Sequence, residues 1–276
     1  MSLLSPDPFL RHIAACNNAV LPGARGRVTL GGHTIGYALP AHAPAAPLPD
    51  RLAFDAHVSN LARRGAFIPR DELFDVRDDQ TSAILATIDR GAIPLLGILA
   101  DGVHLNGLVR RADGIHLWVA RRAASKRLDP GKLDHIAAGG VGAGFTPQQT
   151  LVKEAEEEAS LPPSLIGQAR QVATLTYALD RAEGLRRDRI TVFDLWLPDH
   201  VTPTPNDGEV TGFSLWPIRQ VLDHVALTDD FKFNVTLVLI DLCLRLGIID
   251  PKAEPGRRIE AALAPLRAKA CPPPPI

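Results

Sequence analysis

The spacing of apolar positions predicts a small mixed region at the start of the chain. Apolar residues three and four apart predict a helix over residues 7–20, and alternating positions around Gly31-Gly32 predict a two-residue hairpin over residues 28–39. A loop rich in proline and alanine and two further helices are expected next, at residues 40–49, 51–64 and 79–90. Helices and hairpins together indicate an α+β region over residues 1–100.

From residue 95 onward the pattern changes to that of a β-meander, followed by further strands and helices. The pairs Asp101-Gly102 and Asp113-Gly114 are turn signals between apolar alternating runs of residues 95–122. Three more strands are predicted at residues 171–179, 189–197 and 212–218, with a charged surface loop at 180–188. Helices are predicted at residues 219–225, 231–247 and 257–268.

One helix has clear start signals and follows a glycine-rich loop. The stretch over residues 139–161 reads GGVGAGFTPQQTLVKEAEEEASL. Thr146 is expected at the N-cap, where Gln149 completes a capping box, and Pro147 fits the first helical position. Four apolar residues share one arc of the helix and predict its buried face: Leu151, Val152, Ala155 and Ala159.

The same helix carries acidic residues on an adjoining arc. Glu154, Glu157 and Glu158 are spaced i, i+3, i+4, so we expect their carboxylates to lie together. Three carboxylates on one face repel one another unless a cation lies between them, and Mg²⁺ prefers oxygen ligands. A solvated helix face has the same composition, so the acidic run alone leaves both interpretations open. The glycine loop and helix start directly before it favour the metal site.

Basic residues gather at the end of the strand before this loop. Arg121 and Arg122 end the predicted strand and Lys126 follows them. Beside an acidic metal site, these cations are suited to neutralise a bound diphosphate, and we group them with the loop residues Gly139 and Gly140 as candidate substrate contacts. A solvated strand end explains the basic residues equally well.

Length and composition bound the class of protein. The 276 residues suffice for one large or two modest domains, and a hydrophobic content of 46% supports a packed core. A net charge of −1 gives no general attraction to nucleic acid or to an anionic membrane, so neither is an expected partner.

The cysteines and the start of the chain indicate a cellular location. Cys16, Cys243 and Cys271 match no zinc spacing and indicate a reducing compartment. The first two stand in apolar surroundings and are expected to be buried. The chain starts without a signal-peptide pattern and has no apolar run of membrane-spanning length, so we expect a cytoplasmic protein.

The stretch from Gly139 to Leu161 resembles the Nudix box, G-x5-E-x7-R-E-U-x-E-E-x-G-U, where U is aliphatic. With Gly139 first, Glu154 falls on the Glu after the Arg, and the paired acids fall on Glu157 and Glu158. Three positions depart from the pattern: Phe145 in place of the early Glu, Lys153 in place of Arg, and Ser160 in place of Gly. Lys153 keeps the charge but cannot form the bidentate fork of an arginine.

The resemblance implies a fold and a chemistry. It implies an α/β (α+β) protein in which a Nudix α/β/α sandwich with a mixed sheet, residues 101–250, follows a smaller α+β domain over 1–100 and precedes a tail over 251–276. It implies that the box glutamates bind Mg²⁺ or Mn²⁺ for hydrolysis of a small-molecule diphosphate. A Glu outside the box often assists, and Glu209 is the matching candidate, although the same residue can instead orient a loop. Family members often pair, so a homodimer is expected as well.

Over residues 10–250 the chain also resembles a narrower Nudix group, related to thiamin pyrophosphokinase, that carries an extra N-terminal domain. The segments that carry this likeness are LWVARRAASKRLDPGKLDHIAAGGVGAG and FKFNVTLVLIDLCLRLGIID. Members remove phosphate from diphosphates of damaged thiamin, such as the oxo and oxy forms. The resemblance implies this substrate, with the N-terminal domain covering the organic group near aromatic residues such as Phe54 or Trp118.

Two other functions stay open from the sequence. Phe145 and Lys153 are consistent with a non-catalytic module that binds a nucleotide or thiamin-like diphosphate without cleaving it. An isomerase acting on an isoprenoid diphosphate would need a proton donor such as cysteine in its pocket, and no cysteine lies near the box in the sequence.

Overall fold

Seven strands form one mixed sheet at the centre of the structure, a computed structural model that describes residues 7–268. Its strands are β5 (Leu99–Arg111), β6 (Gly114–Arg122), β7 (Leu133–Asp134), β8 (Ala137–Gly140), β9 (Arg170–Arg181), β10 (Gly184–Trp196) and β11 (Val210–Pro217). They lie in the order β11-β6-β5-β10-β9, with β7 beside β6 and β8 beside β5. β5 and β10 run parallel and the other pairs are antiparallel, so the expected mixed sheet is confirmed.

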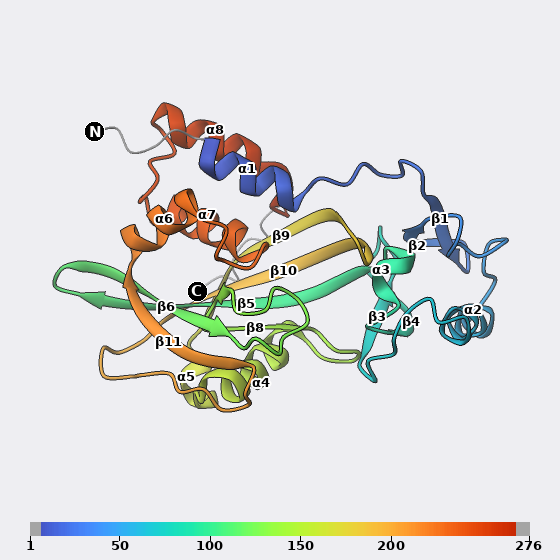
Figure 1. Cartoon of the computed structure of the whole chain (residues 1–276), viewed down its shortest axis with the longest axis horizontal. Helices are drawn as coiled ribbons and strands as arrows, with labels where there is room; N and C mark the ends of the chain where they lie inside the picture. Colours follow the sequence, from blue (N-terminus) through green and yellow to red (C-terminus); the bar gives the residue numbers. More distant parts are fainter. Residues whose placement is uncertain (1–6, 269–276) are drawn as a thin grey trace.

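Helices cover both faces of this sheet and complete a three-layer sandwich (Figure 1). One face is covered by α1 (Asp7–Cys16), α6 (Ile218–Leu227), α7 (Val235–Arg245), α8 (Glu254–Leu263) and the 3₁₀ turn η1 (Ala264–Leu266), and the other by α4 (Pro147–Ala159) and α5 (Pro163–Ile166). Side chains alternate across a strand. Leu117 and Val119 of β6 therefore join the core beneath α6 and α7, whereas Trp118 joins the core beneath α4.

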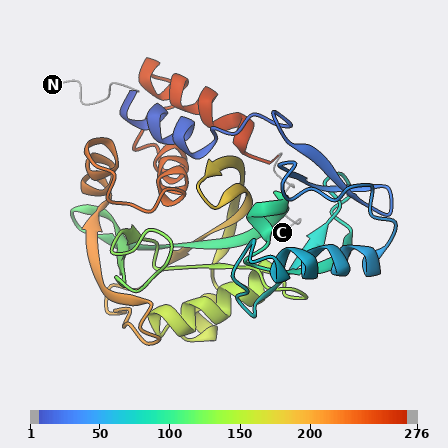
Figure 2. The same cartoon turned by 45° about the vertical axis from the view of Figure 1, so that its right-hand side comes forward.

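A smaller region lies at one end of the large sheet (Figures 1 and 2). It contains β1 (Gly26–Leu30), β2 (His33–Ala38), α2 (Arg51–Arg63), β3 (Leu73–Arg77), β4 (Ile84–Asp89) and α3 (Ile93–Leu96). β1 and β2 form one antiparallel pair and β3 and β4 another, and Phe54, Leu61 and Ile88 are buried in their common core. α1 is different, because its Phe9 and Ile13 are buried in the core of the large sheet although they precede this region in the chain.

Several local predictions are confirmed. Gly31 and Gly32 have φ of 58° and 86°, which the β1–β2 turn requires and glycine adopts readily. Thr146 and Gln149 form the expected capping box at the start of α4. Ser160, which replaces the glycine of the box pattern, ends α4 in the left-handed region with φ of 55°, and its hydroxyl donates to Thr204 O at 3.0 Å. Cys16 is buried, as expected from its apolar neighbours, and so is Cys243.

The helix predicted at residues 79–90 is wrong, because these residues form the end of a turn and strand β4. The carboxylate of Asp78 accepts hydrogen bonds from Thr81 N and Oγ1 and closes the turn between β3 and β4. Ala86 and Ile88 then alternate into the core of the small region. A composition that suits a helix is overridden here by burial in the tertiary structure.

The turn predicted at Asp101-Gly102 is also wrong, because β5 runs straight through it. Gly102 pairs with Gly140 of β8 on one side and with Ile190 of β10 on the other. The carboxylate of Asp101 accepts from Arg189 Nε at 2.6 Å, so the residue is held by partners far away in the chain. Pairing on both sides outweighs a local turn preference.

Other boundaries move by smaller amounts. The charged stretch at 180–188 is mostly strand, since β9 ends at Arg181 and β10 begins at Gly184. The first helix ends at Cys16, and the last begins at Glu254. The Pro-rich tail after residue 268 and its Cys271 lie outside the described residues. In the part of the chain that is described, no helix has the length and apolar character needed to span a membrane.

Gly36→Ala is expected to destabilise the fold where the small region meets the sheet. A methyl group at Gly36 would overlap the carbonyl oxygen of Leu96, and backbone cannot move aside cheaply. We expect a loss of about 1–3 kcal/mol in the free energy of unfolding, measured by urea denaturation. Gly26→Ala in the same hairpin is the control, because among the described residues no atom beyond its chain neighbours lies within 4 Å of the added methyl group. Equal stability of the two variants would contradict the close contact between β2 and α3.

Candidate active site

A cleft of about 1130 Å³ lies between the small region and the large sheet. Phe67 and Phe74 line it from the small region, and Gly139 and Gly140 of β8 line it from the sheet. A side chain at Gly140 would overlap the ring of Phe74, so this glycine lets the two parts approach closely. Phe54 and Trp118, expected near a bound organic group, are instead buried in the two hydrophobic cores.

The cleft is rich in positive charge. Of the described residues that line it, nine are Lys or Arg and four are Asp or Glu. Among the cations, Arg181 and Arg186 both lie over the ring of Phe233, with guanidinium carbons 5.0 Å and 5.6 Å from its centroid. Low-dielectric walls strengthen the field of such a cation-lined cleft, which favours an anionic ligand.

Two of the box glutamates face β8 at the edge of this cleft. Glu158 is buried, and its Oε2 accepts a hydrogen bond from Ala138 N at 2.9 Å. Glu154 lies one turn earlier on α4, with its carboxylate directly against Gly139, where a methyl group would overlap it. The geometry of α4 therefore brings Glu154 and Glu158 to the same strand, as their i, i+4 spacing predicts.

Burial changes the acidity of both side chains. Burial, together with the nearby charge of Asp134, raises the pKa of Glu158 to about 8. Burial also raises the pKa of Glu154, and the carboxylates of Glu157 and Glu209 add to this effect. Two carboxylates held away from water are therefore costly to ionise until a cation binds them.

Glu157 does not join this pair. Its side chain is 48% exposed and accepts a hydrogen bond from Lys153 Nζ at 2.6 Å. Lys153 also contacts Glu154 Oε1 at 3.4 Å, and the hydrogen bond to Glu157 raises the pKa of Lys153. Lys153, at the arginine position of the box, thus bridges Glu154 and Glu157. Phe145, at the early acidic position, is 49% exposed.

Glu209 comes to the site from a distant part of the chain. Its carboxylate is paired with Lys126, and both residues line the cleft. Its carbonyl accepts from Ala123 N at 2.9 Å, which fixes the loop before β11 against the end of β6. Glu209 therefore lies within electrostatic reach of Glu154, and it also holds a neighbouring loop.

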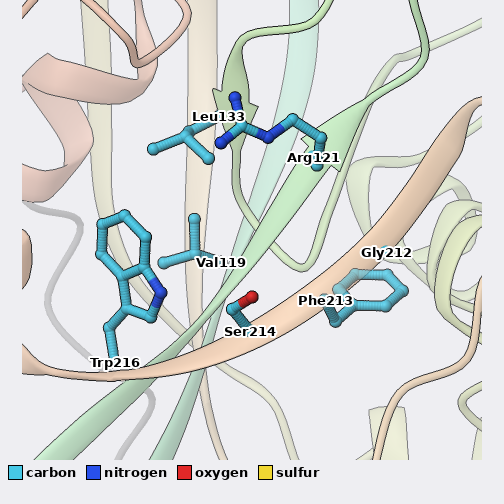
Figure 3. A pocket seen from close by; sticks show the side chains of 7 residues that line it. All are labelled: Val119, Arg121, Leu133, Gly212, Phe213, Ser214 and Trp216. Atoms are coloured by element: carbon cyan, nitrogen blue, oxygen red, sulfur yellow. The ribbon is translucent and has the colours of Figure 1, made fainter.

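The side chains of the two arginines at the end of β6 line different pockets, whereas both were expected to contact the substrate. Arg121 donates to Gly131 O at 2.9 Å and lines a small pocket of about 130 Å³ with Phe213 and Trp216 (Figure 3), not the cleft. Arg122 lines the cleft but is buried and donates to Asp134 Oδ2 at 2.6 Å. Successive residues of a strand point to opposite faces, so neighbours in sequence need not share a site.

A buried polar cluster at the base of the cleft was not predicted from the sequence. His104 Nδ1 lies 2.7 Å from His135 Nδ1, and the carboxylate of Asp134 also lies close to Lys232, at 3.5 Å. Lys232 and Arg122 hold the pKa of Asp134 well below its usual range against the opposing effect of burial. Burial lowers the pKa of His135 to about 4, so both that ring and the similarly shifted ring of His104 are neutral at pH 7.

This cluster contains a set of atoms that can in principle hold a metal. Within residues 7–268, ligand atoms of His104, Asp134 and His135 come within 4.8 Å of one another. The carboxylate of Asp134 is already neutralised by two buried cations, Arg122 and Lys232, which would repel a divalent ion. Glu154 and Glu158 fit Mg²⁺ better, because carboxylate oxygens are its preferred ligands. A bound cation would also offset the cost of ionising these two carboxylates away from water.

The signal for this cluster in the sequence is weak. His104 interrupts an apolar run in β5, VHLNGLV, which is unusual for a buried strand. Asp134 and Lys232 lie about a hundred residues apart in the chain and carry no motif that links them. They meet because Leu133 of β7 pairs with Phe231 in an isolated bridge, a long-range contact that spacing does not reveal.

The chain is similar to known proteins over part of its length. Residues 102–236 match the NUDIX domain family model. Nudix hydrolase 24, chloroplastic, from Arabidopsis thaliana is 37% identical over 203 residues, which cover 73% of this chain and 55% of that protein. Nudix hydrolase 20, chloroplastic, from the same plant is 36% identical over 206 residues, 74% of this chain and 55% of that protein. The chain thus spans about half the length of the curated relatives it matches.

Among solved structures, DR0079 from Deinococcus radiodurans has a TM-score of 0.49 with 22% identity, covering 63% of this chain and all of that one. From the family match, residues 102–236 form a NUDIX domain, and the chain is similar to the two plant Nudix hydrolases over about three quarters of its length.

The affinity for Mg²⁺ is expected to depend on pH through Glu158. Its folded pKa of about 8 exceeds the ordinary value of 4.5, so the metal-free folded protein holds an extra proton between these values. The contribution of Glu158 to the stability of the metal-free protein therefore falls as the pH rises from about 4.5 to about 8. Mg²⁺ must displace the proton, so its affinity should rise about tenfold per pH unit up to about pH 8 and then level off.

Calorimetric Mg²⁺ titrations across this pH range test the expectation. Glu158→Gln should weaken Mg²⁺ binding and remove the steep part of the pH dependence. An affinity for Mg²⁺ that is independent of pH in the unaltered protein would contradict the assignment.

Proposed function

We propose that this chain is a Nudix-type hydrolase that cleaves the diphosphate of a small organic molecule with Mg²⁺ or Mn²⁺. The observation that carries the proposal is the placement of two carboxylates, the buried Glu158 and the half-buried Glu154, at the edge of a cleft whose charged lining residues are mainly cations. An acidic pair suits a divalent metal, and the surrounding cations suit the remaining charge of a diphosphate.

Each residue has a separate task in this proposal. Glu154 and Glu158 would hold the metal, which when bound polarises phosphoryl oxygens and lowers the pKa of a water. Lys126 would neutralise phosphate charge, and Glu209, released from Lys126 by the incoming anion, would accept a proton near Glu154. Gly139 and Gly140 line the cleft beside α4, where their backbone would lie against the phosphates.

We further propose a damaged thiamin diphosphate, in its oxo or oxy form, as the substrate. This step rests on the resemblance of the chain to the thiamin-related Nudix group. The volume of the cleft, about 1130 Å³, accommodates an organic group of that size, and Phe67 and Phe74 supply an apolar wall for it. The proposed product is the monophosphate.

A non-catalytic binding role is the second candidate. It is favoured by one observation, the exposed pairing of Glu157 with Lys153, which leaves two rather than three box carboxylates against β8. A homodimer and a cytoplasmic location also stay predictions for this chain.

Phosphate release over a panel of diphosphates tests the hydrolase. The panel contains thiamin diphosphate with its oxo and oxy forms, ADP-ribose, NADH, coenzyme A and nucleoside triphosphates, each with Mg²⁺ or Mn²⁺. Glu158→Gln is expected to lower kcat/KM by roughly a hundredfold or more, because it removes a buried metal ligand and each tenfold step is about 1.4 kcal/mol of barrier. Glu157→Gln, at an exposed position, should lower it less.

Glu156→Gln is the matched control, because this exposed glutamate lies on the same helix but outside the acidic arc. Turnover of nucleotides alone would support diphosphate hydrolysis but contradict damaged thiamin diphosphate as the substrate. Tight binding without phosphate release from any member of the panel would favour the binding module.

A further inference from the structure

Asn234 lines the cleft and carries a side-chain carbonyl that is unpaired among the described residues. The residue directly precedes α7, is only 4% exposed, and lines the cleft. Its side-chain Oδ1 is buried and has no hydrogen-bond partner within residues 7–268. A buried acceptor without a partner is unfavourable, so such an atom at the wall of a cleft points to a ligand.

The hydrogen-bond network fixes which end of this amide is free. Tyr177 donates its hydroxyl proton to Asp188 Oδ2 at 2.5 Å, so the oxygen of Tyr177 can act toward Asn234 only as an acceptor. The atom of Asn234 that lies 3.1 Å from this oxygen is therefore the NH₂ group. Rotating the amide by half a turn would place two acceptors against each other, so Oδ1 is the free atom.

The neighbouring histidine supports the same orientation. His104 Nε2 lies 3.4 Å from Asn234 Nδ2 and accepts from it, which leaves the proton of the neutral ring on Nδ1. That proton is donated to His135 Nδ1 at 2.7 Å. The NH₂ group of Asn234 is thus held by two acceptors, whereas its carbonyl oxygen remains available to accept a hydrogen bond.

Asn234 does not perform the structural role that is usual at its position. Asparagine before a helix commonly accepts a hydrogen bond from the first turn. Asn234 has φ of −88° and ψ of −16°, and its side chain caps no backbone N–H of α7. Its carbonyl is therefore used neither for the helix nor for the polar network of Tyr177 and His104.

We propose that Asn234 Oδ1 accepts a hydrogen bond from a neutral N–H group on the organic part of the substrate. This selects diphosphates whose organic group is a heteroaromatic ring with an amino or ring N–H. The inference rests on the proposed function and names its substrate class. Phosphate oxygens are acceptors and would be repelled by the carbonyl, so the diphosphate is assigned to the surroundings of Glu154 and Lys126. A cationic donor is disfavoured because Lys232 and Arg186 line the same part of the cleft.

Pairs of probes that differ by one amino group test this inference. The pairs are thiamin diphosphate with its deamino analogue, and ADP with purine riboside diphosphate. Dissociation constants are measured by calorimetry with Ca²⁺ in place of Mg²⁺, and phosphate release is measured separately with Mg²⁺. In at least one pair the unaltered protein should bind the amino form about tenfold more tightly or better, since the analogue leaves Oδ1 unpaired.

Asn234→Leu should bring this ratio close to one, mainly by weakening the amino form. Thr236→Val is the matched control at the start of α7, because Thr236 Oγ1 donates only to Phe233 O in the structure, and it should keep the ratio. Melting temperatures of both variants report folding, and the ratio in the unaltered protein needs no variant at all.

The inference is overturned if the unaltered protein binds both members of each pair equally, if it binds none of them, or if folded Asn234→Leu keeps the ratio. A ratio that depends on Asn234 without any phosphate release would leave the inference standing and remove the proposed hydrolysis. Phosphate release from both members of a pair, with a ratio of dissociation constants near one, would support the proposed hydrolysis and overturn the inference about Asn234.

Discussion

The site depends on the close approach of helix α4 to strand β8. Gly139 has no side chain, so the carboxylate of Glu154 can lie against the strand, and Glu158 is buried with one oxygen on the amide of Ala138. Burial raises the pKa of both glutamates. The capping box at Thr146 and the left-handed end at Ser160 fix the length of α4, and so decide which of its turns meets β8.

The rest of the cleft is supplied by elements that lie far from α4 in the chain. The small N-terminal region contributes Phe67 and Phe74, the β9–β10 hairpin contributes Arg181 and Arg186, and the segment before α7 contributes Lys232 and Asn234. The acidic pair against β8 and the polar network of Asn234, His104 and Tyr177 therefore come from separate elements of the chain. In the function proposed above, metal binding and the selection of the organic group depend on different residues.

Predictions from the sequence succeeded where the cause is local and failed where it is not. The hairpin at Gly31-Gly32 follows from the backbone freedom of its own residues. The helix predicted at residues 79–90 failed because burial of Ile88 in the small core outweighs helix propensity. The turn predicted at Asp101-Gly102 failed because two partner strands hold β5 extended.

For the candidate site, the sequence by itself determined the helix, its caps and the acidic arc, because these depend on a period of 3.6 residues. It also indicated the superfamily through the same stretch. Only the tertiary structure decided that Glu158 is buried while Glu157 pairs with Lys153, and that Arg121 and Arg122 face opposite sides. It alone joined His104, Asp134 and Asn234, because burial and hydrogen bonding between distant segments are set by sheet pairing, which local spacing does not encode.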